Sequence, residues 1–232
     1  MKATRLDQAT WPEIDERVVT EPSTLIVPLG ATEQHGPHLP IGTDTSIAVA
    51  LTDLAAGELP GSVVAPAIPY GSSGEHQGFA GTLSIGTEVT ELLLVELGRS
   101  ATETFDRLLF VNAHGGNAEP LVAAVARLCL EGRDVRSWSP NWGGDAHAGH
   151  TETSLMLALT PESVRGGCAA GNTAPLGALI GDLRMVGVRG VAPNGVLGDP
   201  TDASAGEGDL LIAAAVEDLR TMLAAWSTGV TA

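Results

Sequence analysis

Four side chains that can bind metal ions lie close together near the start of this 232-residue chain: Glu33, His35, His38 and Asp44. In an extended segment, side chains at positions i and i+2 point the same way, so Glu33 and His35 can converge on one point. Carboxylates mixed with imidazoles suit a divalent transition metal better than calcium or magnesium. Asp44 alone could simply cap a following helix, but the group as a whole indicates a metal site.

Two further segments carry side chains of the same kind. His114 follows an apolar run in RLLFVNAHGGN, and the segment GGDAHAGHTETS contains Asp145, His147, His150 and Glu152. A single histidine after a strand is more often structural, and Glu152 could serve as a helix cap. However, all six histidines lie on glycine-rich junctions and none on the apolar face of a helix. This distribution favours one shared site.

The elements that must position these residues are strands followed by sharp turns and helices. Leu25 to Val27, Val63 to Ile68, Arg107 onward and Val135 to Trp138 are apolar runs that predict strands. Continuous apolar strands alternating with helices are typical of a mostly parallel sheet covered by helices on both faces. In such α/β folds, ligands bind beyond the carboxyl ends of the strands, where all three junctions would meet.

Helices are predicted between and after these strands. Apolar spacing and end signals place them at 43–59, 87–105, 118–130, from about 151, and 208–226, after a short helix within 1–24. We expect Thr43 or Asp44 to cap the first of these, Asn117 the third, and Ser204 with Glu207 the last. Two glycine-rich stretches, 70–86 and 166–206, are interpreted as irregular. The first carries Glu75 and His76, for which a pocket role and a solvated loop are equally supported.

Composition excludes several classes of protein. Residues 1–232 are predicted to form a single domain, because 44% hydrophobic and 17% charged residues can build one sizeable core. The formal net charge of −16 argues against nucleic acid or an anionic membrane as a partner. No stretch is typical of a signal peptide or a membrane span, and the two cysteines do not suggest a disulfide framework. We therefore expect a cytoplasmic protein.

The combined residues predict a hydrolytic centre with two divalent ions, iron or zinc, with manganese also possible. Such ions activate water and polarise a carbonyl group, while a spare histidine protonates the departing nitrogen. The alternative from another class is a metal- or peptide-binding module without catalysis. His147 discriminates between them, because a purely structural site would not need a histidine outside the ligand set. The residues expected at the centre are Glu33, His35, Asp44, His114 and Glu152, with His147 nearby.

The assembled motifs resemble the creatininase (creatinine amidohydrolase) family. The matching segments are PLGATEQHGPHLPIGTDT, GEHQGFAGTLSIGT, FVNAHGGN and HAGHTETSLML. The resemblance implies an α/β fold, a two-metal site, hydrolysis of amides and a hexamer. It implies that Asp44 is the bridging carboxylate and that His147 is the catalytic histidine. By the same resemblance, the other family ligands are Glu33, His35 and His114.

One position departs from the family pattern. Creatininase itself has a glutamate ligand where this chain has Gly116, so we expect Glu152 to supply the missing carboxylate and creatinine not to be the substrate. Within the family, GEHQGFAGTLSIGTE, GGDAHAGHTETS and GVLGDPTDA are similar to the branch that belongs to the mycofactocin system. That branch implies trimming of a modified precursor peptide, with release of its C-terminal Val-Tyr-derived unit. A creatinine or other small-amide amidohydrolase is the alternative within the family.

Overall fold

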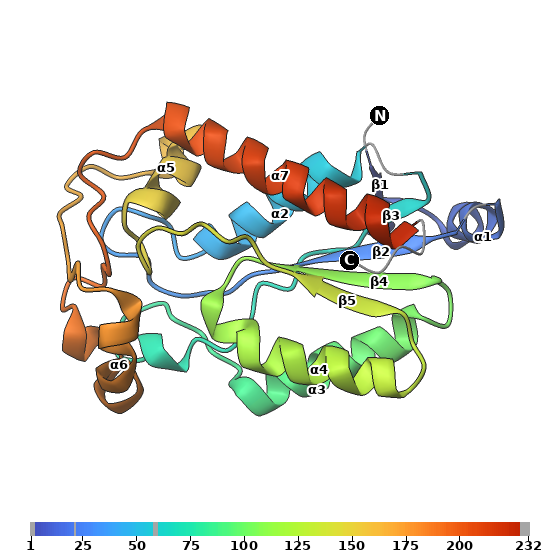
Figure 1. Cartoon of the computed structure of the whole chain (residues 1–232), viewed down its shortest axis with the longest axis horizontal. Coiled ribbons are helices and arrows are strands. Elements are labelled where there is room, and N and C mark those ends of the chain that lie inside the picture. Colours follow the sequence, from blue (N-terminus) through green and yellow to red (C-terminus); the bar gives the residue numbers. More distant parts are fainter. Residues whose placement is uncertain (1–2, 21, 58–59, 228–232) are drawn as a thin grey trace.

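The computed structural model describes residues 3–20, 22–57 and 60–227. Five strands form one sheet in the order β1-β3-β2-β4-β5, and every pairing is parallel (Figure 1). The fold is therefore the single-domain α/β architecture that the alternation of strands and helices predicts. The strands are β1 (Thr4–Arg5), β2 (Thr24–Leu29), β3 (Ser62–Val64), β4 (Arg107–Asn112) and β5 (Val135–Trp138).

The sheet is buried on both faces because successive side chains of each strand point to opposite sides. In β2, Leu25 and Val27 face one core cluster while Ile26 faces the other. In β4, Phe110 and Leu109 divide in the same way. Full burial of each such side chain stabilises the fold by about 1.5–3 kcal/mol. This explains why the two central strands read as unbroken apolar runs.

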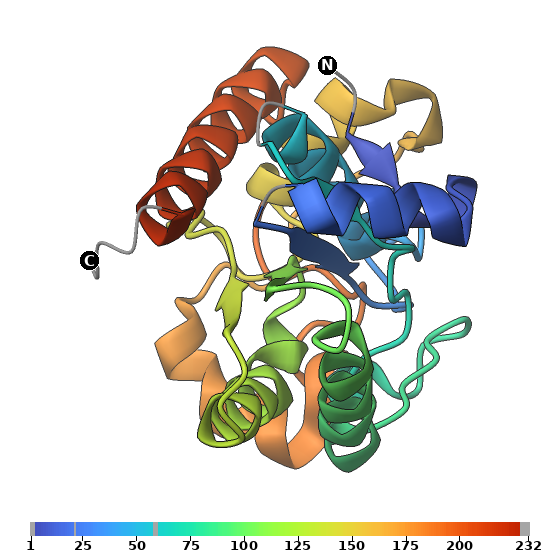
Figure 2. The ribbon, with the colours of Figure 1, turned by 90° about the vertical axis from the view of Figure 1, so that its right-hand side faces the viewer.

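Helices cover the two faces unequally. One face packs against α2, α5 and α7, and the other packs against α3 and α4, with Ile14 of α1 joining them (Figures 1 and 2). The helices are α1 (Trp11–Thr20), α2 (Thr43–Ala56), α3 (Thr87–Ala101), α4 (Ala118–Leu130), α5 (His150–Leu159), α6 (Leu176–Val191) and α7 (Ala205–Ser227). The described residues also contain four short 3-10 helices, namely η1 (Leu6–Gln8), η2 (Gly74–His76), η3 (Gly115–Asn117) and η4 (Pro161–Ser163).

Several boundaries differ from the sequence predictions. The strand expected to run to Ile68 ends at Val64, and Ile68 makes only an isolated bridge with Leu29. The predicted caps of α2 and α4 are wrong, because neither helix has a side-chain cap at its N-cap residue. Ser204 does cap α7, since its Oγ accepts the N–H of Glu207 at 3.3 Å. The end of the predicted helix at 43–59 lies partly outside the described residues.

The largest error concerns the stretch 166–206, which contains the 16-residue helix α6 rather than only loops. This helix lies at one end of the molecule beside η2, whose residues carry Glu75 and His76 (Figure 1). The backbone of α6 bends at Gly187, whose φ of 66° is left-handed. Within the described residues, no helix is long and apolar enough to cross a membrane.

Candidate metal centre

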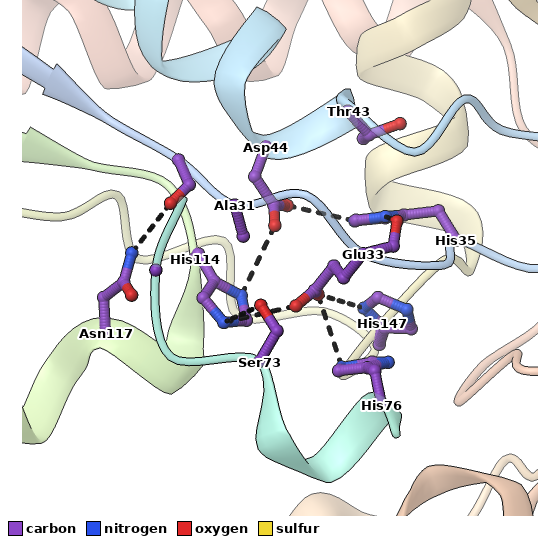
Figure 3. A network of polar contacts seen from close by, with 12 residues as sticks. Ala31, Glu33, His35, Thr43, Asp44, Ser73, His76, His114, Asn117 and His147 are labelled. Atoms are coloured by element: carbon purple, nitrogen blue, oxygen red, sulfur yellow. Dashed lines mark hydrogen bonds and ion pairs between the residues drawn. The ribbon is translucent and has the colours of Figure 1, made fainter. Parts of the chain in front are cut away.

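The first part of the site follows directly from the end of β2. The chain leaves the sheet at Leu29, runs through an irregular segment that carries Glu33 and His35, and enters α2 at Thr43 (Figure 3). A Cβ atom on Gly30 would collide with the backbone of Thr45, so glycine lets this segment pack directly on the helix. This packing brings Asp44, in the first turn of α2, close to Glu33 and His35.

Asp44 lies between two histidines that come from different segments. Its Oδ1 is 3.0 Å from His35 Nε2, and its Oδ2 is 3.3 Å from His114 Nδ1 (Figure 3). The carboxylate therefore does not cap α2, and the interpretation of Asp44 as a helix cap is wrong. His114 follows β4, the neighbour of β2, and Glu33 Oε2 lies 3.3 Å from its Nε2.

Glu152 and His147 reach the same place from the junction between β5 and α5. Glu152 Oε2 is 3.8 Å from His35 Nε2 and accepts the N–H of Ala148 at 2.5 Å. Ala148 has a φ of 51°, a left-handed conformation that is uncommon for a residue with a side chain. The backbone of His147 pairs with Leu197, which fixes this turn against the segment after α6.

The N-terminus of α5 is held by a carboxylate from the loop before it. Asp145 accepts the N–H of Thr151 at 3.2 Å and also the N–H of His150. A Cβ atom on Gly149 or on Gly198 would collide with this carboxylate. Asp145 therefore caps α5 and stands outside the cluster, while the helix it caps carries Glu152.

Within the described residues, four overlapping groups have ligand atoms within 4.8 Å of one another. Two of them share Asp44: one contains Glu33, Asp44 and His114, and the other contains His35, Asp44 and Glu152. A further group joins Glu33 and His35 to His147, and the last joins Glu33 to Glu75 and His76. The five residues predicted as ligands thus lie together, with His147 beside them, its Nδ1 3.7 Å from Glu33 Oε1 and 3.9 Å from Glu152 Oε2.

In their neutral form, three histidines turn an unprotonated nitrogen toward the cluster, because their other nitrogen faces a backbone carbonyl. His35 Nδ1 lies 3.1 Å from the oxygen of Glu33, and His114 Nε2 lies 2.8 Å from that of Ser72. His147 Nε2 lies 2.8 Å from the oxygen of Gln34. A carbonyl oxygen only accepts, so the second nitrogen of each ring carries no proton in the neutral form. Histidines that bind metals are commonly oriented in this way.

Three carboxylate oxygens at the cluster have no hydrogen-bond donor. Both carboxylate oxygens of Glu33 and Oδ2 of Asp44 are buried without a hydrogen-bond partner among the described residues. An unsatisfied buried charge is strongly unfavourable, and a bound cation removes the penalty. These partnerless carboxylate oxygens, together with the neighbouring imidazoles, therefore fit the divalent metal ions that the sequence predicts as cofactors.

The pKa values of Glu33 and His35 also reflect the excess of buried carboxylates. Burial raises the pKa of Glu33 to about 8, despite the lowering effect of His114. For His35, burial would lower the pKa, but the charges of Asp44 and Glu152 outweigh it and raise the pKa to about 10. In the metal-free protein the cluster thus retains protons in place of a cation.

Two other buried histidines behave differently. Burial and the neighbouring His35 hold the pKa of His147 well below its ordinary value. Burial, with His114 and His35, lowers the pKa of His76 to about 3. Both imidazoles are therefore neutral at pH 7, as a proton acceptor or a metal ligand must be.

Some sequence candidates lie elsewhere. His38 is buried beside the cluster, but its Nε2 pairs with Thr153 Oγ1 at 2.8 Å. His150 contacts Glu207 at 2.7 Å, away from the cluster. At Gly116, a Cβ atom would collide with Ser72 and His114, so this backbone leaves no space for a side chain there.

The structure brings two further residues to the cluster: His76, which the sequence left open between a pocket role and a solvated loop, and Gln34, which the sequence did not single out. His76 Nε2 lies 3.3 Å from Glu33 Oε1, and Gln34 contacts both His76 and His147 (Figure 3 shows the two histidines). The Glu75-His76 pair on a glycine-rich stretch was a signal for His76. Gln34 gave none, because in an extended segment a residue between two ligands is expected to point away from them.

An all-parallel α/β sheet with buried carboxylates and imidazoles at its carboxyl edge defines a protein suited to binding divalent metal ions. The family model described as creatinine amidohydrolase (creatininase) matches residues 7–223. The chain therefore belongs to the creatininase family.

Particular relatives narrow the comparison. The mycofactocin precursor peptide peptidase of Mycobacterium ulcerans is 50% identical over 95% of this chain and 88% of its own length. The protein of the same name from Mycobacterium tuberculosis is 53% identical over 89% of this chain and 86% of its own length. A crystal structure of creatinine amidohydrolase superposes with a TM-score of 0.76 at 25% identity, over 96% of this chain and 97% of the other.

Proposed function

We propose that this protein is a metal-dependent peptidase that trims a modified precursor peptide in mycofactocin biosynthesis, releasing the C-terminal Val-Tyr-derived unit. Membership of a family of amide hydrolases supports the reaction type. The names of relatives that share half of its residues over most of the chain support the substrate. The single structural observation that supports the proposal is the position of Asp44 in two groups of potential ligands, in which Asp44 Oδ2 and both carboxylate oxygens of Glu33 lack a hydrogen-bond partner.

The ligand groups suggest two ions per chain. Glu33, Asp44 and His114 would hold one ion, and His35, Asp44 and Glu152 the other, so that Glu152 takes the place of the ligand lost at Gly116. Iron or zinc suits this mixture of imidazole and carboxylate, and manganese is also compatible. Solved creatininases of the same fold include zinc and manganese forms.

Bound divalent ions would supply Lewis acidity, which polarises the scissile carbonyl and makes water a better nucleophile. The residues supply orientation and proton transfer. His147 presents its unprotonated Nδ1 to the cluster from a rigid backbone turn, so it can accept a proton there and return it to the departing nitrogen. This is the role of catalytic residue that the family resemblance implies for His147.

Selectivity has to come from the surrounding segments, because the centre itself does not distinguish what flanks an amide bond. The two long glycine-rich stretches meet where α6 packs on η2, beside His76. A surface formed by two long segments suits an extended peptide substrate better than a small cyclic one such as creatinine. Gly116 stands where creatininase places a glutamate near creatinine, and the backbone here leaves no space for such a side chain.

We further propose that the protein acts in the cytoplasm as a homo-oligomer, a hexamer by family resemblance. Several large apolar side chains of α6 are exposed in the single chain, including Ile180, Met185 and Val186. Light scattering coupled to size exclusion measures the assembly directly. A monomeric mass at micromolar concentration would contradict this part of the proposal.

A competition assay tests the function. The purified protein, loaded with zinc or iron, is incubated with equal concentrations of creatinine and the modified precursor peptide, and both are followed by mass spectrometry. We expect cleavage before the C-terminal Val-Tyr-derived unit, unchanged creatinine, and no cleavage after chelation. Comparable turnover of creatinine would favour the small-amide alternative. Tight metal binding without any turnover would favour the binding module.

A further inference from the structure

The side-chain amide of Gln34 has a fixed orientation. Its Oε1 accepts the N–H of Gly36 at 2.9 Å, and its Nε2 donates to the carbonyl of Gly195 at 3.0 Å. A backbone N–H can only donate and a backbone carbonyl can only accept, so these two contacts leave no freedom to exchange the oxygen and the nitrogen. Gln34 Nε2 is therefore a donor with one remaining hydrogen.

That hydrogen is directed at His76. Gln34 Nε2 lies 2.9 Å from His76 Nδ1, so Nδ1 has to accept and cannot carry a proton. Gln34 Nε2 also lies 3.1 Å from His147 Nε2, but that nitrogen already donates to the Gln34 carbonyl at 2.8 Å. Both hydrogens of Gln34 Nε2 are thereby assigned, one to the Gly195 carbonyl and one to His76 Nδ1. Each of these hydrogen bonds pairs one donor with one acceptor, and the 3.1 Å approach to His147 Nε2 is not one of them.

From this arrangement we infer that Gln34 fixes His76 in the neutral tautomer with its proton on Nε2, so that an N–H rather than a lone pair lies beside Glu33 and positions that carboxylate in the metal centre. His76 Nε2 lies 3.3 Å from Glu33 Oε1, an electrostatic contact rather than a hydrogen bond (Figure 3). The inference concerns the proposed metal centre and does not depend on which substrate is cleaved. His76 acts through Glu33 and is a positioning residue, and Gln34 in turn positions His76.

His76 thereby differs from the three other histidines around the cluster. In the neutral form, His35, His114 and His147 turn an unprotonated nitrogen toward it, whereas His76 turns an N–H. The possible ligand group of Glu33 with Glu75 and His76 is consequently not a metal site, although its atoms lie within 4.8 Å of one another. Binding a metal through His76 Nε2 would force a proton onto Nδ1, directly against the Gln34 donor.

Neutron diffraction on crystals of the zinc-loaded protein tests the protonation directly. We expect deuterium on His76 Nε2, none on His76 Nδ1, and two deuterium atoms on Gln34 Nε2 directed at His76 and Gly195. Deuterium on His76 Nδ1, or zinc bonded to His76 Nε2, would overturn the inference. If the protein binds no zinc, the proposed function fails, and the metal-free crystal still decides the tautomer.

Three variants test the positioning role by zinc affinity, measured by competition with a chromogenic chelator. His76→Leu removes the donor, and we expect a loss of about 10–100-fold, typical for residues that orient metal ligands. His76→Gln restores an N–H near the position of Nε2 and should recover most of the affinity. His150→Leu is the matched control, since His150 contacts Glu207 at the surface. Unchanged affinity in His76→Leu, or an equal loss in His76→Gln, would contradict the positioning role.

Discussion

Asp44 is the residue on which both halves of the proposed centre depend. Its two oxygens face His35 and His114, and Oδ2 is buried without a hydrogen-bond partner. We expect Asp44→Asn to bind neither ion tightly, because it removes the shared negative charge while keeping the shape. Metal analysis after gel filtration measures the ion content. Asp53→Asn, an exposed change on the same helix, is the control and should keep both ions. Two tightly bound ions in Asp44→Asn would refute the bridging role.

A substitution of His147 can distinguish its proposed catalytic role from metal binding. Its Nδ1 lies 3.7 Å from Glu33 Oε1, close enough to join the cluster and also close enough to exchange protons with a substrate held there. We predict that His147→Ala retains the ions and loses about 10²–10⁴-fold in rate, the usual contribution of a general acid–base group. Ion content and single-turnover peptide cleavage are measured on the same preparation. Joint loss of ions and activity would make His147 a ligand.

The raised pKa values of Glu33 and His35 give the metal-free protein a pH dependence. The pKa of Glu33 rises from 4.5 to about 8 on folding, and that of His35 from 6.5 to about 10. Between these values the folded state binds more protons, so the free energy of unfolding falls as pH rises. The lowered pKa of His76 and of His147 acts below pH 6.5, in the opposite direction.

We therefore predict that the melting temperature of the chelator-treated protein falls between pH 6.5 and pH 9. Glu33→Gln should remove the part of this fall that lies below about pH 8, because it no longer gains or loses a proton. The control is Glu162→Gln, which changes an exposed carboxylate. Scanning calorimetry at four pH values gives the slopes. Parallel slopes in Glu33→Gln and the parent protein would show that the Glu33 carboxylate is not the cause.

The residues of the site were predictable for a simple reason. Glu33, His35, Asp44, His114, Glu152 and His147 stand at the ends of strands that the sequence identifies, and parallel strands bring these ends to one edge. The assignment of each role among them stays a prediction. Gln34 was not predictable, and a pocket role for His76 could not be distinguished from a solvated loop, because their contacts join segments more than 40 positions apart. No local pattern encodes such contacts.

At the scale of elements, α5 connects stability to the site. Asp145 accepts the N–H groups of the first two residues of the helix that carries Glu152. We predict that Asp145→Ala destabilises the protein by about 0.5–2 kcal/mol, the range found for N-cap residues that satisfy the same kind of N–H group, and also weakens metal binding because Glu152 moves with the helix end. Urea unfolding and zinc affinity are the measurements.

Ser204→Ala provides the matched comparison. It removes the cap of α7, which carries none of the proposed ligands, and should lower stability within the same range while zinc affinity is unchanged. Equal loss of zinc affinity in the two variants would mean that general destabilisation, rather than the position of Glu152, sets metal binding.

Elements with a buried apolar face were predicted well, and those without one were not. The helix α4 and the strand β5 have the predicted bounds, since both pack on the sheet. Only Leu179 and Val188 of α6 are buried, and four glycines interrupt its sequence. Packing on η2 stabilises this helix in spite of its composition. The two-residue strand β1 is too short to give any periodic signal.

At the scale of the whole molecule, charge repulsion opposes folding. The chain has 28 acidic and 12 basic residues. Salt screens repulsion between exposed charges beyond the Debye length, which is about 10 Å at 0.1 M. We predict that the melting temperature rises when sodium chloride increases from low to physiological ionic strength. The rise should shrink at pH 5, where carboxylates begin to accept protons. A melting temperature that falls with salt would show that attractive ion pairs dominate instead.

The distance in sequence between the proposed ligands has a consequence for the order in which the protein is made. Glu33, His35 and Asp44 leave the ribosome first, whereas Glu152 is added on the order of 100 residues later, about 5–20 s at the usual rate of synthesis. Until His114 is added neither of the two ligand groups is complete, and the group that contains Glu152 stays incomplete for the whole interval. We therefore expect the nascent chain to acquire the complete pair of ion sites only after α5 has been made.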